Sequence, residues 1–134
     1  MTDIIYDSCR SFSVNDSIFD DVRDNYSDFS QWFKKCNDLN RTVVKSGGKS
    51  AIAILKYKSS SIKICTFIVS KHQRRHGVGK ALMAELFDHA KMMGKEELYL
   101  SVLNTNKNFI KFCEHVGFKL QSTDGTNLIF NYKF

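Results

Sequence analysis

The alternation of apolar and polar residues divides the chain into segments of two kinds. Apolar or β-branched residues run almost without a break over 62–69 and over 98–103, which predicts two strands covered on both faces. Between them, apolar residues recur every three or four positions over 78–93, which predicts an amphipathic helix that ends at Gly94. The three segments are therefore expected to form a β-α-β unit with a right-handed crossover and parallel strands that are neighbours or near-neighbours.

The first forty residues are predicted to hold one strand and two helices. The strand lies at 4–6 or at 11–14, and the pattern leaves both alternatives open. Asp16 is placed to cap the first helix, and Asp28 with Gln31 has capping-box spacing for the second. Each helix has an apolar face, formed by Ile18, Phe19, Val22 and Tyr26 in the first and by Phe29, Trp32, Phe33 and Cys36 in the second.

Two hairpins and one more helix complete the prediction. Glycine-containing turns between β-prone segments indicate the hairpins. The resulting order is β-α-α-β-β-β-α-β-α-β-β, an α/β chain with a mixed sheet. The hairpin strands are expected over 41–45 with 51–57 and over 118–120 with 127–134, and the helix over 106–116.

Length and composition predict a single domain over 1–134. The chain has 43% hydrophobic and 13% aromatic residues, which suits a globular protein with a substantial core. No apolar run approaches the length of a membrane span, and the acidic N-terminus does not resemble a signal peptide. The four cysteines are scattered without metal-ligand spacing, so we expect reduced thiols, a cytoplasmic location and no metal. The chain is expected to be a monomer or a homodimer.

The strongest chemical signal is the turn between the first buried strand and the long helix. Basic residues crowd into 71–76, and Gly77 and Gly79 follow at the start of the helix. The first N–H groups of a helix have no intrahelical partner, and glycines let an anion approach them, so the pattern predicts a polyphosphate site. The spacing is not that of a Walker loop, and a dinucleotide fingerprint would need glycine at Leu82.

The sequence Arg74-Arg-His-Gly-Val-Gly79 resembles the R/Q-x-x-G-x-G/A acetyl-CoA signature of the GNAT superfamily of acyl-CoA N-acyltransferases. Asn106 and the pair Gly117-Phe118 follow at spacings that this superfamily shows. The resemblance covers most of the chain from about residue 15 and is strongest over 62–118. It implies a GNAT-like fold, a twisted mixed β-sheet with helices on both faces.

The resemblance also implies how acetyl-CoA, the co-substrate, is held. Backbone amides of the turn would bind the pyrophosphate, and the pantetheine arm would pair with the end of the first buried strand, where one N–H polarises the thioester carbonyl. This requires the two central parallel strands to separate. An asparagine that reaches CoA in relatives matches Asn106, for which a helix N-cap is the alternative role. The implied CoA-binding residues are Phe67, Ile68, Val69, Arg74, Arg75, His76, Gly77, Val78, Gly79, Lys80 and Asn106.

Two catalytic positions of the family differ in this chain. Relatives often carry a glutamate base where this sequence has Ser101, so Glu97, His72 or a water relay is left to accept the proton of the amine. Relatives often use a tyrosine to protonate the leaving sulfur, and this position is Cys113. Cys113 is either a small buried hydrophobe or the general acid.

The expected activity is therefore N-acetyl transfer from acetyl-CoA to a primary amine. Residues 1–28 carry seven acidic and two basic residues, whereas the remainder carries eighteen basic and seven acidic ones. This asymmetry suggests an acidic side that attracts a cationic acceptor and a basic side that holds CoA. Two alternatives stay open: a CoA-binding module without turnover, and, less favoured, a basic nucleic-acid-binding protein.

Overall fold

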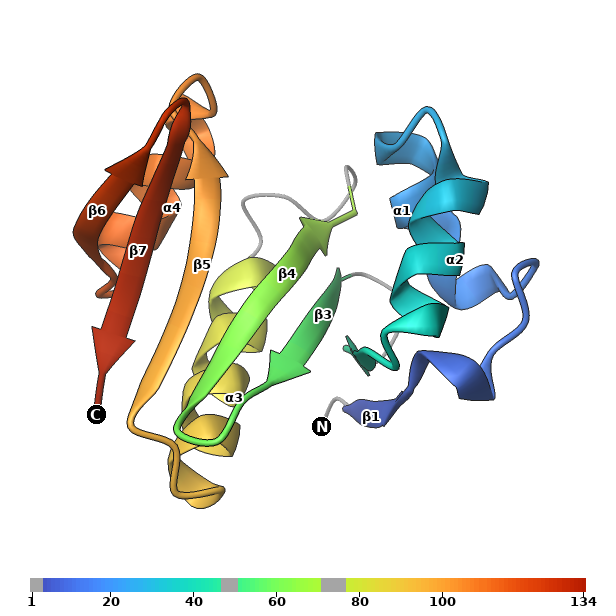
Figure 1. Ribbon diagram of the computed structural model, residues 1–134, viewed down its shortest axis with the longest axis horizontal. Helices are drawn as coiled ribbons and strands as arrows, with labels where there is room; N and C mark the ends of the chain where they lie inside the picture. The colour runs from blue at the N-terminus through green and yellow to red at the C-terminus, as the bar shows by residue number, and fades with distance from the viewer. Residues whose placement is uncertain (1–3, 47–50, 71–76) are drawn as a thin grey trace. The chain divides into compact units, whose positions relative to one another are not determined.

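The computed structural model describes residues 4–46, 51–70 and 77–134 (Figure 1). Within these residues the order of strands and α-helices is the one that the sequence predicts. The strands are β1 (Ile5–Ser8), β2 (Thr42–Lys45), β3 (Ala51–Tyr57), β4 (Ser61–Val69), β5 (Glu97–Leu103), β6 (Lys119–Asp124) and β7 (Asn127–Lys133), and the helices are α1 (Asp20–Asn25), α2 (Phe29–Asp38), α3 (Val78–Met92) and α4 (Lys107–His115).

The strands form one mixed sheet in the order β1-β2-β3-β4-β5-β7-β6. Strands β4 and β5 are parallel, with Ser61 opposite Glu97 and Ile64 opposite Leu100. The pairs β1–β2, β2–β3, β5–β7 and β6–β7 are antiparallel. Parallel neighbours need a long crossover, and α3 lies in the connection between β4 and β5. The predicted β-α-β unit with neighbouring parallel strands is therefore confirmed.

The chain divides into two compact units, which we call the N-terminal unit (residues 1–55 and 66–82) and the C-terminal unit (residues 56–65 and 83–134). The N-terminal unit holds β1, β2, α1 and α2, most of β3, the end of β4 and the first turn of α3. The C-terminal unit holds β5, β6, β7 and α4, with the start of β4 and the rest of α3.

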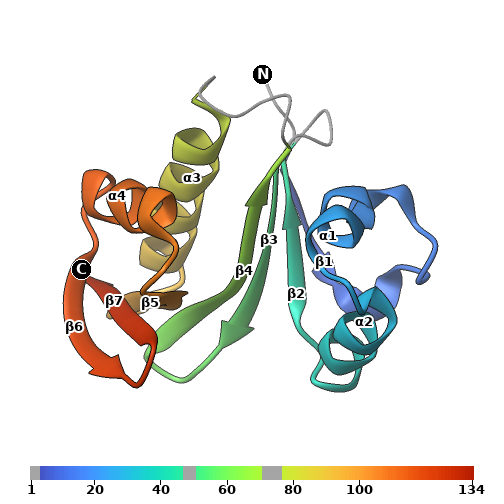
Figure 2. The same ribbon diagram turned by 90° about the horizontal axis from the view of Figure 1, so that it is seen from above.

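Aromatic side chains fill the core of the N-terminal unit, where α1 and α2 lie on one side of β1 and β2 (Figure 2). Phe19 is fully buried at its centre. The apolar face of α2 packs into this core, because its rings contact Phe19 and the cluster around it. The rings around Phe19 are Phe12, Phe29, Trp32 and Phe33, with centroids 5.4 to 6.0 Å from that of Phe19.

The C-terminal unit has its own aromatic contacts, centred on Phe87 of α3. The Phe87 ring lies 4.6 Å from that of Tyr132 and 5.4 Å from that of Phe118, measured between centroids. Gly117 ends α4 at φ +108, and a Cβ at this position would lie 3.1 Å from the Tyr132 ring. Glycine is thus required here by both the backbone conformation and the close approach of a side chain.

The first helix differs from the prediction. Asp16 caps a 3-10 turn, Ser17–Phe19, by accepting a hydrogen bond from the Ile18 N–H at 2.9 Å, and α1 begins only at Asp20. Tyr26 follows the end of α1 and is 39% exposed, so it does not share the buried face. A capping signal marks where a helical turn begins, but it does not fix whether the turn continues as 3-10 or α. Of the two alternatives for the first strand, the earlier one is confirmed by β1, since Cys9–Ser11 is another 3-10 turn.

Candidate active site

The start of α3 has the features of an anion site. Gly77 has φ +76, a conformation that favours glycine, and its carbonyl accepts the first intrahelical hydrogen bond from the Ala81 N–H at 2.9 Å. No acidic residue lies in the first turn, and both Gly77 and Lys80 are exposed. The N–H groups at the start of a helix are not used by the helix itself. The predicted residues Arg74, Arg75 and His76 lie outside the described residues.

The end of β4 lies in the same compact unit as this helix start. Phe67, Ile68 and Val69 are half-buried at the end of the nine-residue strand. Ile68 packs against the aromatic core of the N-terminal unit. A strand end and a glycine-opened helix therefore flank the basic residues 71–76, as the sequence predicts.

Asn106 forms the N-cap of α4, in the C-terminal unit. Its Oδ1 accepts a hydrogen bond from the Phe109 N–H at 3.4 Å, so the capping role is confirmed. The cap uses the carbonyl oxygen of the amide, whereas a phosphate or a pantetheine carbonyl needs the N–H₂ donors of the same group. The two roles considered for Asn106 are therefore compatible.

Cys113 is fully buried in α4. Burial, and to a smaller extent the neighbouring Glu114 carboxylate, raises the pKa of the Cys113 thiol to about 12. An ordinary thiol has a pKa near 9.0, so proton transfer from Cys113 to a departing thiolate would run uphill. The burial and the pKa both favour the packing role of Cys113 over the general-acid role.

We expect Cys113→Ala to lower the free energy of unfolding by about 1 kcal/mol through the lost packing. Its kcat should stay within about threefold of the unchanged chain. A general acid contributes typically about 10²–10⁴-fold, so a fall of kcat in that range in the folded variant would establish the catalytic role instead. Steady-state kinetics and urea denaturation of the same preparation separate the two outcomes.

The pH dependence of stability gives Cys113→Ala a second readout. The folded-state pKa of about 12 lies above the ordinary thiol value of 9.0. Between these pH values the folded chain keeps the Cys113 proton, whereas the unfolded chain releases it. The contribution of Cys113 to the free energy of unfolding is therefore fully present below pH 9 and is lost as the pH rises toward 12. The stability of Cys113→Ala should fall less steeply over this range than that of the unchanged chain.

Glu97 begins β5, and its Oε1 accepts a hydrogen bond from the Asn131 Nδ2 of β7 at 2.8 Å. Asn131 is itself buried, so the pair links the two strands inside the C-terminal unit. Ser101 lies four residues further along β5 and is exposed. Glu97 as the general base stays a prediction, and His72, the other candidate, lies outside the described residues.

The sequence reasoning missed Arg23, which the structure shows bonded to three groups around it. The one signal available was its spacing from Asp20, three residues earlier on the same helix. The other two partners are backbone carbonyls, which no residue type reveals.

Metal-binding clusters and membrane-spanning helices are absent from the part of the chain that the structure describes. Within it, no group of three or more metal-ligating side chains is brought together. No helix there has the length and apolar character needed to cross a membrane. The four cysteines are free thiols, three of them buried and Cys65 exposed.

Comparison with known proteins places these features in a family. The model of the acetyltransferase (GNAT) family matches residues 5–118. No curated protein sequence matches the chain.

Solved structures share the fold at low sequence identity. An N-acetyltransferase, PaiA, from Thermoplasma acidophilum in complex with coenzyme A is 18% identical, with a TM-score of 0.74, over 100% of this chain and 99% of that one. A ribosomal-protein-alanine N-acetyltransferase from Escherichia coli is 19% identical, with a TM-score of 0.73, over 99% of this chain and 94% of that one. A GNAT family acetyltransferase from Elizabethkingia anophelis with acetyl-CoA bound is 11% identical, with a TM-score of 0.72, over 98% of each. With a family match over most of its length and this fold, the chain belongs to the acetyltransferase (GNAT) family.

Proposed function

We propose that this chain transfers the acetyl group of acetyl-CoA to a primary amine, which attacks the thioester directly in a ternary complex. The observation that carries the proposal is the start of α3, where Gly77 at φ +76 opens a helix with no acidic residue in its first turn, shortly after the end of β4. Two of the similar structures support it, since one was solved with coenzyme A and another with acetyl-CoA.

Binding of acetyl-CoA would use backbone groups more than side chains. The N–H groups of Val78, Gly79 and Lys80 are at the start of α3, where the positive end of the helix dipole favours the pyrophosphate. The basic residues over 71–76 would add charge-assisted contacts. The pantetheine arm would run along 67–69, where a backbone N–H can polarise the thioester carbonyl.

The transfer needs two proton movements. The neutral amine attacks the carbonyl carbon, the C–S bond breaks, and CoA leaves as a thiolate. One proton passes from the amine nitrogen to Glu97, to His72 or through water to solvent, and the sulfur takes up a proton. Because burial holds the Cys113 proton tightly, we assign protonation of the sulfur to solvent.

The acceptor is proposed to be a cationic amine, because acidic residues concentrate in 1–28. Two of these acidic residues already bond to neighbouring groups. Asp20 pairs with Arg23 at 2.7 Å, and Asp28 accepts the N-cap bond of α2 from the Gln31 N–H. Asp24 is exposed and Asp21 half-exposed, and these two are the carboxylates that we assign to attracting the acceptor.

The cationic-acceptor proposal predicts a salt effect. For a polyamine acceptor, kcat/KM should fall at least several-fold when the ionic strength rises from about 0.05 M to about 0.5 M, because salt screens attraction between exposed charges. A neutral amine serves as the control and should change little. A preference for neutral or acidic amines, or equal salt effects on both classes, would overturn this assignment.

A CoA-binding module without turnover is the second candidate. It is favoured by Ser101 and Cys113, which stand where relatives often carry a glutamate and a tyrosine. Calorimetric titration with acetyl-CoA, followed by thiol release with a panel of amines, separates the two. Binding with amine-dependent thiol release supports the transferase, and binding without release by any amine supports the module. No binding at all contradicts both.

A further inference from the structure

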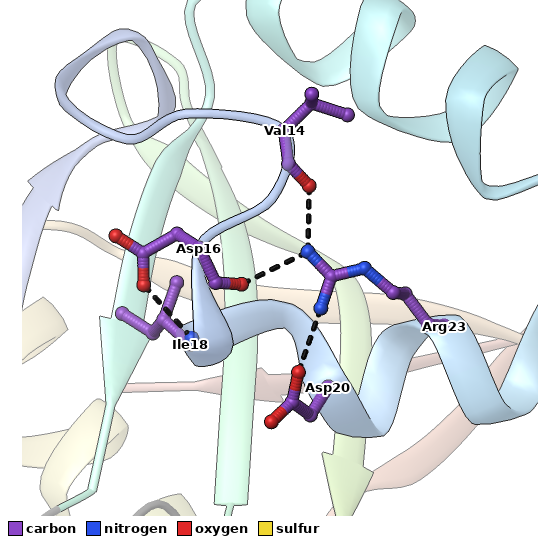
Figure 3. A network of polar contacts seen from close by, with 5 residues as sticks. All are labelled: Val14, Asp16, Ile18, Asp20 and Arg23. Carbon is purple, nitrogen blue, oxygen red and sulfur yellow. Dashed lines mark hydrogen bonds and ion pairs between the residues drawn. The ribbon is translucent and has the colours of Figure 1, made fainter.

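The guanidinium group of Arg23, in α1, contacts three segments of the N-terminal unit, and its polar contacts are drawn in Figure 3. Its Nη2 donates to the carbonyl oxygens of Val14 and Asp16, at 2.6 and 3.0 Å, and its Nη1 donates to Asp20 Oδ1 at 2.7 Å. The guanidinium carbon also lies 4.8 Å from the centroid of the Phe29 ring. One side chain thus joins the loop before α1, the start of α1 and the start of α2.

This arrangement is more than a surface ion pair. The Arg23 side chain is 30% exposed, and its bond to the Asp16 carbonyl is partly buried, whereas its bonds to Val14 and Asp20 are exposed. Two of its partners are backbone carbonyls, which cannot move without moving the loop itself. A planar guanidinium can serve several acceptors and a ring face at once, whereas a lysine ammonium is a single point charge.

The segments that Arg23 joins contact the end of β4 through the aromatic core. Phe29 packs against the cluster that contains Ile18 and Phe19, and Ile68 packs against the same cluster. Ile68 lies in the stretch proposed to hold the thioester. A shift of the loop or of α1 would therefore be transmitted through packed side chains to the place where the amine and the thioester meet.

We propose that Arg23 is a positioning residue for the acceptor: it fixes the loop at 14–16, α1 and the start of α2 against the end of β4, and so sets where the amine lies relative to the thioester. This inference rests on the proposed function. The residue acts through the segments it holds and touches neither substrate. Its loss should weaken acceptor use while leaving acetyl-CoA binding intact.

Kinetics of Arg23→Gln, Arg23→Lys and Asp20→Asn test the proposal, with a polyamine acceptor. In Arg23→Gln the KM of the acceptor should rise by about tenfold or more and kcat should fall, since small misplacements of a reactant are costly. The KM of acetyl-CoA should stay within about twofold. Arg23→Lys keeps the positive charge but loses the planar guanidinium, so its acceptor KM should rise less than that of Arg23→Gln. Asp20→Asn leaves both carbonyl contacts in place, so its acceptor KM should stay close to that of the unchanged chain.

Arg10→Gln is the matched control. Arg10 also donates to two backbone carbonyls, those of Asn37 and Asp38, at 3.0 and 3.2 Å, but these lie at the other end of α2. Both glutamine variants should lower Tm by a few degrees, roughly 2–5 °C. The acceptor KM of Arg10→Gln should be unchanged.

Equal acceptor KM values in Arg23→Gln and Arg10→Gln would overturn the proposal and assign Arg23 to stability alone. If Arg23→Gln does not fold, Arg23→Lys and Asp20→Asn decide the question by the same KM comparison. Failure of the proposed function is seen separately, because the unchanged chain would then release no CoA with any amine.

Discussion

Gly77→Trp should abolish acetyl-CoA binding, whereas Gly94→Trp should leave it intact. Gly77 and Gly94 form a matched pair, with φ of +76 and +72, and among the described residues a Cβ at either position would meet no atom within 4 Å beyond its chain neighbours. Each substitution places a side chain in the left-handed region and should destabilise the fold by about 1–2 kcal/mol. They differ in location, because Gly77 precedes the first turn of α3 and Gly94 follows its last.

The expected loss for Gly77→Trp is at least about 100-fold in Kd, equivalent to about 2.7 kcal/mol, because an indole would occupy the space of the pyrophosphate. Calorimetry with acetyl-CoA measures the loss, and circular dichroism shows whether both variants are folded. Unchanged affinity in a folded Gly77→Trp variant would remove the start of α3 from the binding site. Equal losses in both variants would point to a general effect of destabilisation.

Phe19→Ala should be the most destabilising single substitution in the N-terminal unit. The side chain is fully buried, and its ring contacts those of Phe12, Phe29, Trp32 and Phe33. Truncation of a buried phenylalanine costs about 3–5 kcal/mol, a large part of the stability of a domain of this size. Urea denaturation at a pH near neutrality measures the change.

Tyr26→Ala is the control for Phe19→Ala. Tyr26 also contacts the aromatic cluster, with its ring centroid 5.8 Å from that of Trp32, but it is 39% exposed. Its loss should cost about 1 kcal/mol. A cost for Phe19→Ala no larger than that for Tyr26→Ala would mean that the aromatic cluster is not the core of the unit.

The sequence predicted the elements that depend on local patterns. The unbroken apolar run before residue 70 and the helical period after Gly77 are strong signals, and β4 and α3 lie where these signals place them. The burial of Cys113 agrees with one of the two roles that the sequence allows, that of a small buried hydrophobe. The assignment of CoA binding to the basic residues between β4 and α3 stays a prediction.

Contacts between distant or backbone groups could not be predicted. The partner of Glu97 is Asn131, 34 residues away, and the contact requires β7 to lie beside β5 in the sheet although α4 and β6 separate them in the sequence. The partners of Arg23 include two carbonyl oxygens, which every residue carries. The short α1 also departs from the pattern, because a 3-10 turn takes up the residues just after the cap.

Detection of the product tests the central claim most directly. The chain is incubated with acetyl-CoA and a panel of primary amines that includes polyamines, amino acids and peptide N-termini, and the amines are then analysed by mass spectrometry. The proposal predicts that at least one amine gains a single acetyl group on nitrogen, that one CoA is released per acetyl transferred, and that Gly77→Trp forms no product. A folded chain that binds acetyl-CoA but acetylates no amine in the panel would contradict the proposed transfer and leave a CoA-binding module as the better account.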